Sequence, residues 1–390
     1  MNLNMWLGRD AHRARVNRAR SLAVAVGLAL ASTANAQTPS FTVIPWAPGA
    51  GSSSVPADVS GDGSVVAGTS WSAADGHRLF RWTKDGGFSF INRPDGWLQY
   101  NDVRLSHDGS TIVGSASIAG NPATRGFRWR QSTGHSLLDP VPGEDITSAT
   151  GVSADGDLVV GHSNKSTSYS VAVRWNAAGQ VERLGEPGNG QFLQHRATAV
   201  SLDGSVVVGV GETFATSQAV RWTQDTGFTG LGWLEAGDIS SPVAVSADGT
   251  TIAGWSTIEP YDANPNPSFR PFRWTSGTGM VQLEAAGDSY ATDMSADGGF
   301  IVGGSFDGAV LWDPSNHAVL LEHLLGSVLG LNLNGVHLAS ATAISSDGST
   351  IVGVGYDPSG VEVGWIATIP GPAAWSIILV AVGSSARRRR

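Results

Sequence analysis

Aromatic and acidic side chains that could hold a ligand gather in five segments between runs of short predicted strands. These segments are residues 92–101, 140–147, 186–196, 233–241 and 284–291. Their candidate binding residues are Trp97, Tyr100, Asp145, His195, Trp233, Glu235, Asp238, Asp288 and Tyr290. Aromatic rings can stack on the apolar faces of sugars, while carboxylates accept hydrogen bonds from sugar hydroxyls. The combination suggests a carbohydrate platform, and the same residues could instead cap the ends of the strands.

Signatures of enzymes and metal sites are missing from the sequence. The histidines show no His-x-x-x-His or similar ligand spacing, and no Gly-x-Ser-x-Gly nucleophile elbow occurs. The chain has no cysteine, which excludes thiol catalysis. We therefore expect no catalytic residue, no metal and no cofactor. Paired carboxylates do occur, so a polysaccharide lyase or glycoside hydrolase is the alternative function.

The five segments lie between copies of a Ser-x-Asp-Gly tetrad, each followed by an apolar run. The seven copies begin at Ser60, Ser106, Ser153, Ser201, Ser246, Ser295 and Ser345, with successive serines 45 to 50 residues apart. Repeats of this length built from short strands are typical of propeller blades, each too small to bury its own faces. The sequence therefore predicts an all-β, seven-bladed β-propeller over residues 37–369.

The fourth copy shows the expected blade in detail. Four short segments at residues 197–201, 205–209, 219–223 and 227–232 predict four strands. The Asp-Gly pair between the first two is a strong hairpin signal, because glycine tolerates the positive φ that such turns need. One Asp per turn falls far short of the about six to eight oxygens that Ca²⁺ takes. We therefore interpret the tetrad as structural.

A tryptophan recurs at one position of the predicted third strand in all seven copies. Five copies carry an Arg-Trp pair there, as in Arg221-Trp222 and Arg273-Trp274. A large indole repeated at one strand position predicts a wedge between neighbouring blades. The arginine points to the other side of the strand, where a covered guanidinium needs a carboxylate or a carbonyl. The tetrad Asp is the candidate partner.

The two ends of the repeat region are predicted to meet in the last blade. The seventh copy provides three strands, at residues 341–345, 350–355 and 363–369. The strand-like residues 41–44 supply the fourth, which closes the ring and leaves no exposed sheet edge. Residues 317–330 form the one helix predicted outside the chain ends, and we expect it to cover the ring between the sixth and seventh blades.

The repeats resemble the extracellular HAF family, whose units read Ala-x-x-Val-Ser-x-Asp-Gly, then an apolar run to Gly and an aromatic-Arg-Trp strand. Residues 197–209 and Phe272-Arg273-Trp274 match this pattern. The resemblance covers nearly all of residues 41–370. It implies an extracellular repeat protein and brings with it no assigned reaction or ligand.

Residues 1–36 have the features of a secretory signal peptide. Five arginines between Arg9 and Arg20 precede an apolar run at residues 22–31. The small-x-small sequence Ala34-Asn35-Ala36 then predicts cleavage after Ala36 by an export signal peptidase.

Residues 370–390 resemble the bacterial PEP-CTERM sorting signal. Pro370-Gly371-Pro372 precedes a short apolar segment, and the chain closes on Arg387, Arg388, Arg389 and Arg390. The resemblance implies processing by an exosortase-like enzyme after transient contact of the C-terminal helix with the inner membrane. Gly371 stands where the family has Glu, so cleavage is left open. An uncleaved weak anchor is the alternative.

The charge of the mature chain limits its partners. Without the two signals, 15 basic and 32 acidic residues remain, a net charge near −17. Such a surface repels phosphate backbones, so we expect no nucleic-acid binding. We predict a non-catalytic structural, adhesive or binding module at the cell surface or in the extracellular matrix of a bacterium. Exopolysaccharide and surface proteins are its candidate partners.

Overall fold

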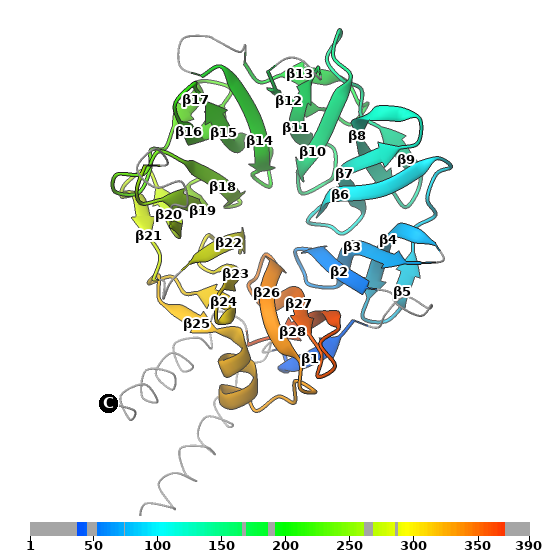
Figure 1. Cartoon of the computed structure of the whole chain (residues 1–390), viewed down its shortest axis with the longest axis vertical. Coiled ribbons are helices and arrows are strands. Elements are labelled where there is room, and N and C mark those ends of the chain that lie inside the picture. The colour runs from blue at the N-terminus through cyan, green and yellow to red at the C-terminus, as the bar shows by residue number, and fades with distance from the viewer. Residues whose placement is uncertain are drawn as a thin grey trace, which may run out of the picture.

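Seven blades of antiparallel strands surround a common axis (Figure 1). The computed structural model describes residues 37–44, 53–73, 75–165, 169–185, 192–260, 268–284 and 288–370. Blades 1 to 5 are separate four-stranded sheets. Blades 6 and 7 also have four strands each and are joined by a single pairing between Gly304 and Ser340. The predicted seven-bladed β-propeller is confirmed, whereas the predicted leader and nearly all of the predicted sorting signal lie outside the described residues.

The strands of each blade follow one another from the axis outward. Blade 1 consists of β2 (Ser53–Val59), β3 (Val65–Ser72), β4 (Gly76–Thr83) and β5 (Gly87–Phe90). Blade 2 consists of β6 (Trp97–Leu105), β7 (Thr111–Ile118), β8 (Asn121–Arg130) and β9 (Gly134–Leu137). Blade 3 consists of β10 (Ile146–Val152), β11 (Val159–Asn164), β12 (Val171–Trp175) and β13 (Val181–Arg183). Blade 4 consists of β14 (Gln194–Val200), β15 (Val206–Glu212), β16 (Ser217–Thr223) and β17 (Gly227–Gly230).

The second half of the ring repeats this order. Blade 5 consists of β18 (Ser240–Val245), β19 (Thr251–Thr257), β20 (Phe269–Thr275) and β21 (Gly279–Gln282). Blade 6 consists of β22 (Ser289–Met294), β23 (Ile301–Ser305), β24 (Gly308–Trp312) and β25 (Ala318–Leu320). Blade 7 consists of β26 (His337–Ile344), β27 (Thr350–Tyr356), β28 (Glu362–Thr368) and the N-terminal strand β1 (Ser40–Val43).

Strand β1 closes the ring as predicted. It pairs antiparallel with β28, from Ser40 opposite Thr368 to Val43 opposite Trp365. The Ile44 amide adds a bond of 2.8 Å to the Gly364 carbonyl. Blade 7 therefore contains both the first and the last strand of the propeller.

The tetrad folds the same way in all seven blades. In blade 4 the Ser201 hydroxyl donates to Asp203 Oδ1 (2.7 Å) and accepts from the Val206 amide (3.0 Å). Asp203 Oδ1 also accepts from the Ser205 amide (3.0 Å), and Gly204 has a φ of +76°. The serine and the aspartate together satisfy the backbone of a turn that only glycine enters without strain. The structural interpretation of the tetrad is confirmed.

The repeated tryptophans pack between blades. Trp175 of blade 3 is fully buried against Val113 and Leu138 of blade 2, and its indole N–H donates to the Asp139 carbonyl (2.7 Å). Trp222 of blade 4 lies in a cluster with residues of blade 3 in the same way. The wedge prediction is confirmed.

Two arginines of the Arg-Trp pairs, Arg128 and Arg273, donate to backbone carbonyls of the next blade. Arg128 of blade 2 donates to the carbonyls of Asp157 (3.1 Å) and Asn176 (2.9 Å) in blade 3. Arg273 of blade 5 likewise donates to the carbonyls of Gly299 and Asp313 in blade 6, both at 3.0 Å. For these two arginines the prediction of a tetrad Asp partner is wrong, because each tetrad Asp already serves its own turn.

The predicted helix at residues 317–330 is shorter than expected. Residues Ala318–Leu320 form β25, the fourth strand of blade 6, and the helix η1 spans His323–Val328. Leu324 and Leu325 of η1 are buried in a cluster that joins blades 6 and 7. The helix lies at the outer rim of the ring, so it covers the junction of these blades from outside (Figure 1).

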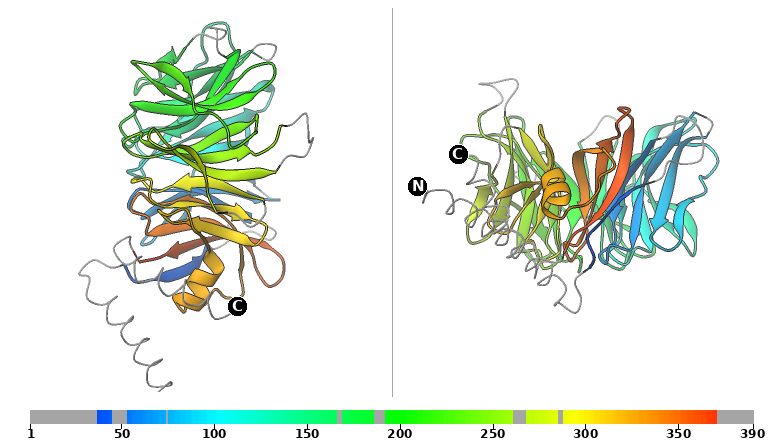
Figure 2. Two further views of the ribbon diagram at one scale, coloured as in Figure 1. Left: turned by 90° about the vertical axis from the view of Figure 1, so that its left-hand side faces the viewer. Right: turned by 90° about the horizontal axis from the view of Figure 1, so that it is seen from below.

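The strands cross the disc between two faces (Figure 2). The tetrad turns share one face, which we call the tetrad face. Backbone bonds there link successive blades, and the bond from the Ser346 amide to the Gly61 carbonyl (3.1 Å) joins blade 7 to blade 1. The hairpins between second and third strands, with the starts of the innermost strands, form the opposite face, which we call the hairpin face.

Candidate functional site

The innermost strands enclose a channel with a wide and a narrow part. A cavity of about 580 Å³ lies toward the hairpin face, and one of about 140 Å³ lies toward the tetrad face. Arg104, Thr150 and Val243 line both cavities. The two parts therefore meet in the middle of the ring.

Hydrogen bonds join neighbouring innermost strands at the level where the two parts of the channel meet. Each innermost strand has a register shift there, for example between Ala197 and Ala199. Four blades place a threonine in this bulge, and its hydroxyl donates to a carbonyl of the next innermost strand. These bonds run from Thr150 to Ala197 (2.8 Å), Thr198 to Pro242 (3.0 Å), Thr292 to Ala341 (2.9 Å) and Thr342 to Pro56 (2.9 Å). These hydrogen bonds join four of the seven pairs of neighbouring innermost strands at this level.

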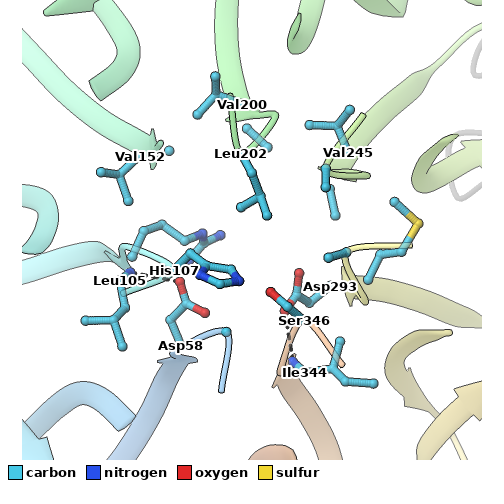
Figure 3. Close-up of a pocket in the computed structure, with 18 of the residues that line it drawn as sticks. Asp58, Leu105, His107, Val152, Val200, Leu202, Val245, Asp293, Ile344 and Ser346 are labelled. Carbon is cyan, nitrogen blue, oxygen red and sulfur yellow. Dashed lines mark hydrogen bonds between the residues drawn. The ribbon is translucent and has the colours of Figure 1, made fainter. Parts of the chain in front are cut away.

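Three of the seven blades place a charged residue two positions before the tetrad serine. These residues are Asp58, Arg104 and Asp293, and the equivalent positions hold Gly151, Ala199, Ala244 and Ala343. All three line the narrow cavity, together with His107 and Ser346. Figure 3 shows the carboxylates of Asp58 and Asp293 pointing into the same space, with His107 and Ser346 beside them. Sequence analysis did not identify this charged group.

Backbone amides hold the two carboxylates in place. Asp58 accepts from the amides of Val59 and Leu105, both at 2.8 Å. Asp293 accepts from the Ile344 amide at 2.9 Å. Burial and then the negative charge of Asp58 raise the pKa of Asp293 to about 7. Burial also raises the pKa of Asp58, opposed by the positive charge of Arg104. The two carboxyls together therefore keep a proton more readily than two isolated carboxyls would.

Exposed apolar side chains concentrate on the hairpin face. Nine of the twelve large exposed ones among the described residues lie there: Trp71, Leu98, Tyr169, Phe214, Phe269, Tyr290, Phe306, Tyr356 and Val361. Each blade contributes at least one. Phe214 and Phe306, at hairpin tips, are 88% and 94% exposed. The other three, Leu137, Val281 and Leu320, lie on outermost strands. The wide cavity thus opens toward the face on which each blade exposes at least one large apolar side chain.

The structure buries three of the nine predicted binding residues. Trp97 and Tyr100 belong to β6 and pack with Phe127 and His135 inside blade 2, with the Trp97 and Tyr100 ring centroids 5.7 Å apart. Burial lowers the pKa of His135 to about 4 and raises the pKa of Tyr100. His195 is buried on β14 and stacks on Phe228 at 4.5 Å. These rings stabilise blades, and Tyr100 also lines the wide cavity.

The other six lie at or near the hairpin face without converging on one point. Trp233 is half-buried and donates to the Ser217 carbonyl (3.0 Å). Glu235 is exposed with a φ of +43°, and Asp145 is exposed. Asp238 accepts from the Thr257 hydroxyl (3.4 Å), and exposed Asp288 pairs with Arg270 (3.0 Å). Of the predicted aromatic residues, Tyr290 alone exposes about half of its surface, at 46%.

Among the described residues, no three His, Asp or Glu side chains are grouped so that they could hold a metal ion. No helix in the described ranges is long and apolar enough to cross a membrane.

Comparison with solved structures supports the fold. An oligogalacturonate lyase in complex with manganese is 12% identical, with a TM-score of 0.56 over 87% of this chain and 99% of that one. The oligogalacturonate lyase from Vibrio parahaemolyticus is 10% identical, with a TM-score of 0.54 over 86% and 98%. The β-propeller domain of the Trilobed protease from Pyrococcus furiosus, described as having an open velcro topology, is 10% identical, with a TM-score of 0.55 over 80% and 95%. At such identities the likeness shows the propeller fold alone.

No family model matches the chain. No curated protein matches it either. The HAF and PEP-CTERM resemblances therefore remain predictions.

Proposed function

We propose that the chain is an exported β-propeller that binds carbohydrate on its hairpin face without cleaving it, at the cell surface or in the extracellular matrix. The observation that carries the proposal is the gathering of exposed rings on the face into which the wide channel opens. Every blade exposes at least one large apolar side chain on this face, and these side chains are candidate contacts for a partner.

The wide cavity has the chemistry of a sugar site. Hydroxyl and amide side chains line it: Thr69, Asn101, Thr150, Thr198, Ser241, Thr292 and Thr342. Apolar Val55, Pro56 and Val243, the Tyr100 ring and the charged Asp102 and Arg104 also line it. Its volume of about 580 Å³ falls within the range of about 300–1,000 Å³ that is usual for small-molecule pockets. Sugars pair with such walls because they present hydroxyls at their edges and C–H groups on their faces.

The chain ends support this orientation. Strand β28 ends at Thr368 and β1 begins opposite it at Ser40, so the chain enters and leaves the propeller at the tetrad face. A sorting tail attached there would hold the tetrad face toward the cell. The hairpin face would then point outward, toward matrix polysaccharide.

Glycoside hydrolysis is the second candidate, and the pair formed by Asp58 and Asp293 favours it. Two neighbouring buried carboxyls with raised pKa values, that of Asp293 to about 7, resemble the acid and base of a glycosidase. Against it, both carboxylates accept hydrogen bonds from backbone amides of the channel wall. This gives them a structural function that a binding module also needs.

A binding screen with product analysis separates the two functions. The purified protein is applied to an array of bacterial and plant polysaccharides, and each ligand found is then incubated with the protein while reducing ends are measured. Binding without new reducing ends supports the proposal. New reducing ends that disappear in Asp293→Asn and come without the unsaturated ends that a lyase leaves would establish the hydrolase. The absence of any carbohydrate ligand would overturn both functions.

A further inference from the structure

The seven blades provide an internal control for the charged residues of the channel. Positions two before the tetrad serine are equivalent in the fold, and four of them hold only Gly or Ala. Blades 3, 4, 5 and 7 fold as complete sheets with no carboxylate or guanidinium at this position. Charge there is therefore not required to build a blade, and the carboxylates of Asp58 and Asp293 need another explanation.

The charged residues lie on one side of the narrow cavity. Asp58, Arg104 and Asp293 come from blades 1, 2 and 6, and Ser346 adds a hydroxyl from blade 7. The opposite wall comes from blades 3, 4 and 5 and is formed by Val152, Val200, Leu202 and Val245 (Figure 3). A cavity with one polar and one apolar wall matches a sugar ring, which carries polar groups on its edge and C–H groups on its face.

The charge of the polar wall selects among sugars. Two carboxylates face one guanidinium, and their mutual repulsion in a buried site is relieved by a positive charge between them. Arg104 uses one nitrogen for the Val103 carbonyl (3.0 Å), which leaves other donors for a ring hydroxyl. A uronate would bring a third carboxylate to the same place, which is unfavourable.

We propose that the narrow end of the channel binds a sugar residue with a free amino group, whose ammonium lies between Asp58 and Asp293. The sugar enters from the hairpin face and places its C–H face against Val200 and Leu202. This inference rests on the proposed carbohydrate binding and specifies its ligand class. It also distinguishes the chain from a binder of galacturonate, the uronate named in the structural relatives.

The raised pKa of Asp293 gives the proposed ammonium binding a definite dependence on pH. The raised pKa of Asp293 means that an arriving ammonium displaces a proton, so affinity rises from pH 5 to pH 7. The charged or titratable groups that face Asp293 are Asp58 of β2, Arg104 of β6 and His107 of the turn after it. Among its lining residues, β10, β14, β18 and β26 contribute no charged side chain.

Calorimetry with three monosaccharides tests the inference. D-Glucosamine, D-glucose and D-galacturonate are titrated into the purified protein at pH 7 and low salt. We expect glucosamine to bind at least about tenfold more tightly than glucose and galacturonate to bind weakest of the three. Asp293→Asn keeps an oxygen that can accept from the Ile344 amide, whereas Asp58→Asn keeps only one of the two oxygens that accept from the Val59 and Leu105 amides. Each variant removes a charge and should abolish the preference. Asp225→Asn, on the exposed turn between β16 and β17, is the matched control and should retain it.

The possible outcomes separate this inference from the proposed function. Equal binding of glucosamine and glucose, an unchanged preference in Asp293→Asn, or no binding of any monosaccharide would each overturn the inference. If polysaccharides still bind in those cases, the proposed function survives. If glucosamine binds as expected and no polysaccharide does, the inference holds and the proposed function fails. Thermal unfolding of every variant ensures that a lost preference is not a lost fold.

Discussion

Asp58 of β2 and Asp293 of β22 extend their carboxylates into one narrow space, although blade 7 separates their strands in the ring (Figure 3). Each carboxylate also reaches the next blade, where Asp58 accepts from the Leu105 amide and Asp293 from the Ile344 amide. The two residues thus combine a structural function in the wall with an electrostatic function in the channel.

Stability should fall as pH rises because of Asp293. Its pKa of about 7 in the folded protein exceeds the usual unfolded value of about 4, so the folded state binds more protons between these values. The contribution of Asp293 is therefore present below pH 4 and is lost as pH rises toward 7, at a cost on the order of a few kcal/mol. The free energy of unfolding of Asp293→Asn relative to that of the wild type should increase from pH 5 to pH 8. Urea unfolding at the two pH values measures this, and parallel pH profiles would contradict it.

Buried His162 should have the opposite effect, so that its contribution to stability falls as pH falls. Burial, aided by the positive charge of Arg196, lowers the pKa of His162 to about 4. The folded state then binds fewer protons than the unfolded chain, so this contribution is present above about pH 6.5 and is lost as pH falls toward 4. His162→Gln should weaken the loss of stability in acid. The control is His323→Gln, which replaces an exposed histidine of η1 and leaves every buried histidine in place.

Removal of the closing strand should destabilise the whole ring. Phe41 of β1 packs on Trp365 with ring centroids 6.4 Å apart, and β1 forms the outer edge of blade 7. Deletion of residues 38–44 removes this packing and exposes the β28 edge, which should cost at least about 3 kcal/mol. The midpoint of thermal unfolding should drop sharply, and an unchanged midpoint would show that the ring closes without β1.

A tetrad serine should contribute more than its exposed neighbour. Ser201→Ala removes a buried hydroxyl that binds Asp203 and the Val206 amide, and should cost roughly 1–3 kcal/mol. Ser205→Ala removes an exposed hydroxyl that binds the same carboxylate (2.9 Å), and should cost less than about 0.5 kcal/mol. Equal losses in urea unfolding would contradict the structural role assigned to the tetrad.

The sequence predicts most of the scaffold because local chemistry repeats seven times. The Asp-Gly turns, the Trp wedge and the strand at residues 41–44 all follow from residue types at fixed spacing, and the structure confirms them. The channel site was not found for a physical reason. The bulge before Asp58 and Asp293 breaks the two-residue alternation of the strand, so the pattern does not indicate which side chain faces the axis.

The aromatic residues show a second limit. Trp97 and Tyr100 were assigned to a loop, yet β6 begins at Trp97 because both rings pack on Phe127. Composition does not distinguish a ring that fills a blade from one that faces solvent. A departure from the repeat was a better signal, since Asp58, Arg104 and Asp293 stand where four other copies have Gly or Ala.

Carbohydrate binding by a variant of the hairpin face tests the central claim most directly. Trp71, Phe214, Phe306 and Tyr356 are replaced together by Ala, and Leu137, Val281 and Leu320 of the outermost strands are replaced together as the control. Affinity for the polysaccharide found in the array is then measured for both proteins, with thermal unfolding alongside. We predict that the first variant loses at least about tenfold in affinity while remaining folded, and that the control binds like the wild type. Full affinity in the first variant would contradict binding through the hairpin face.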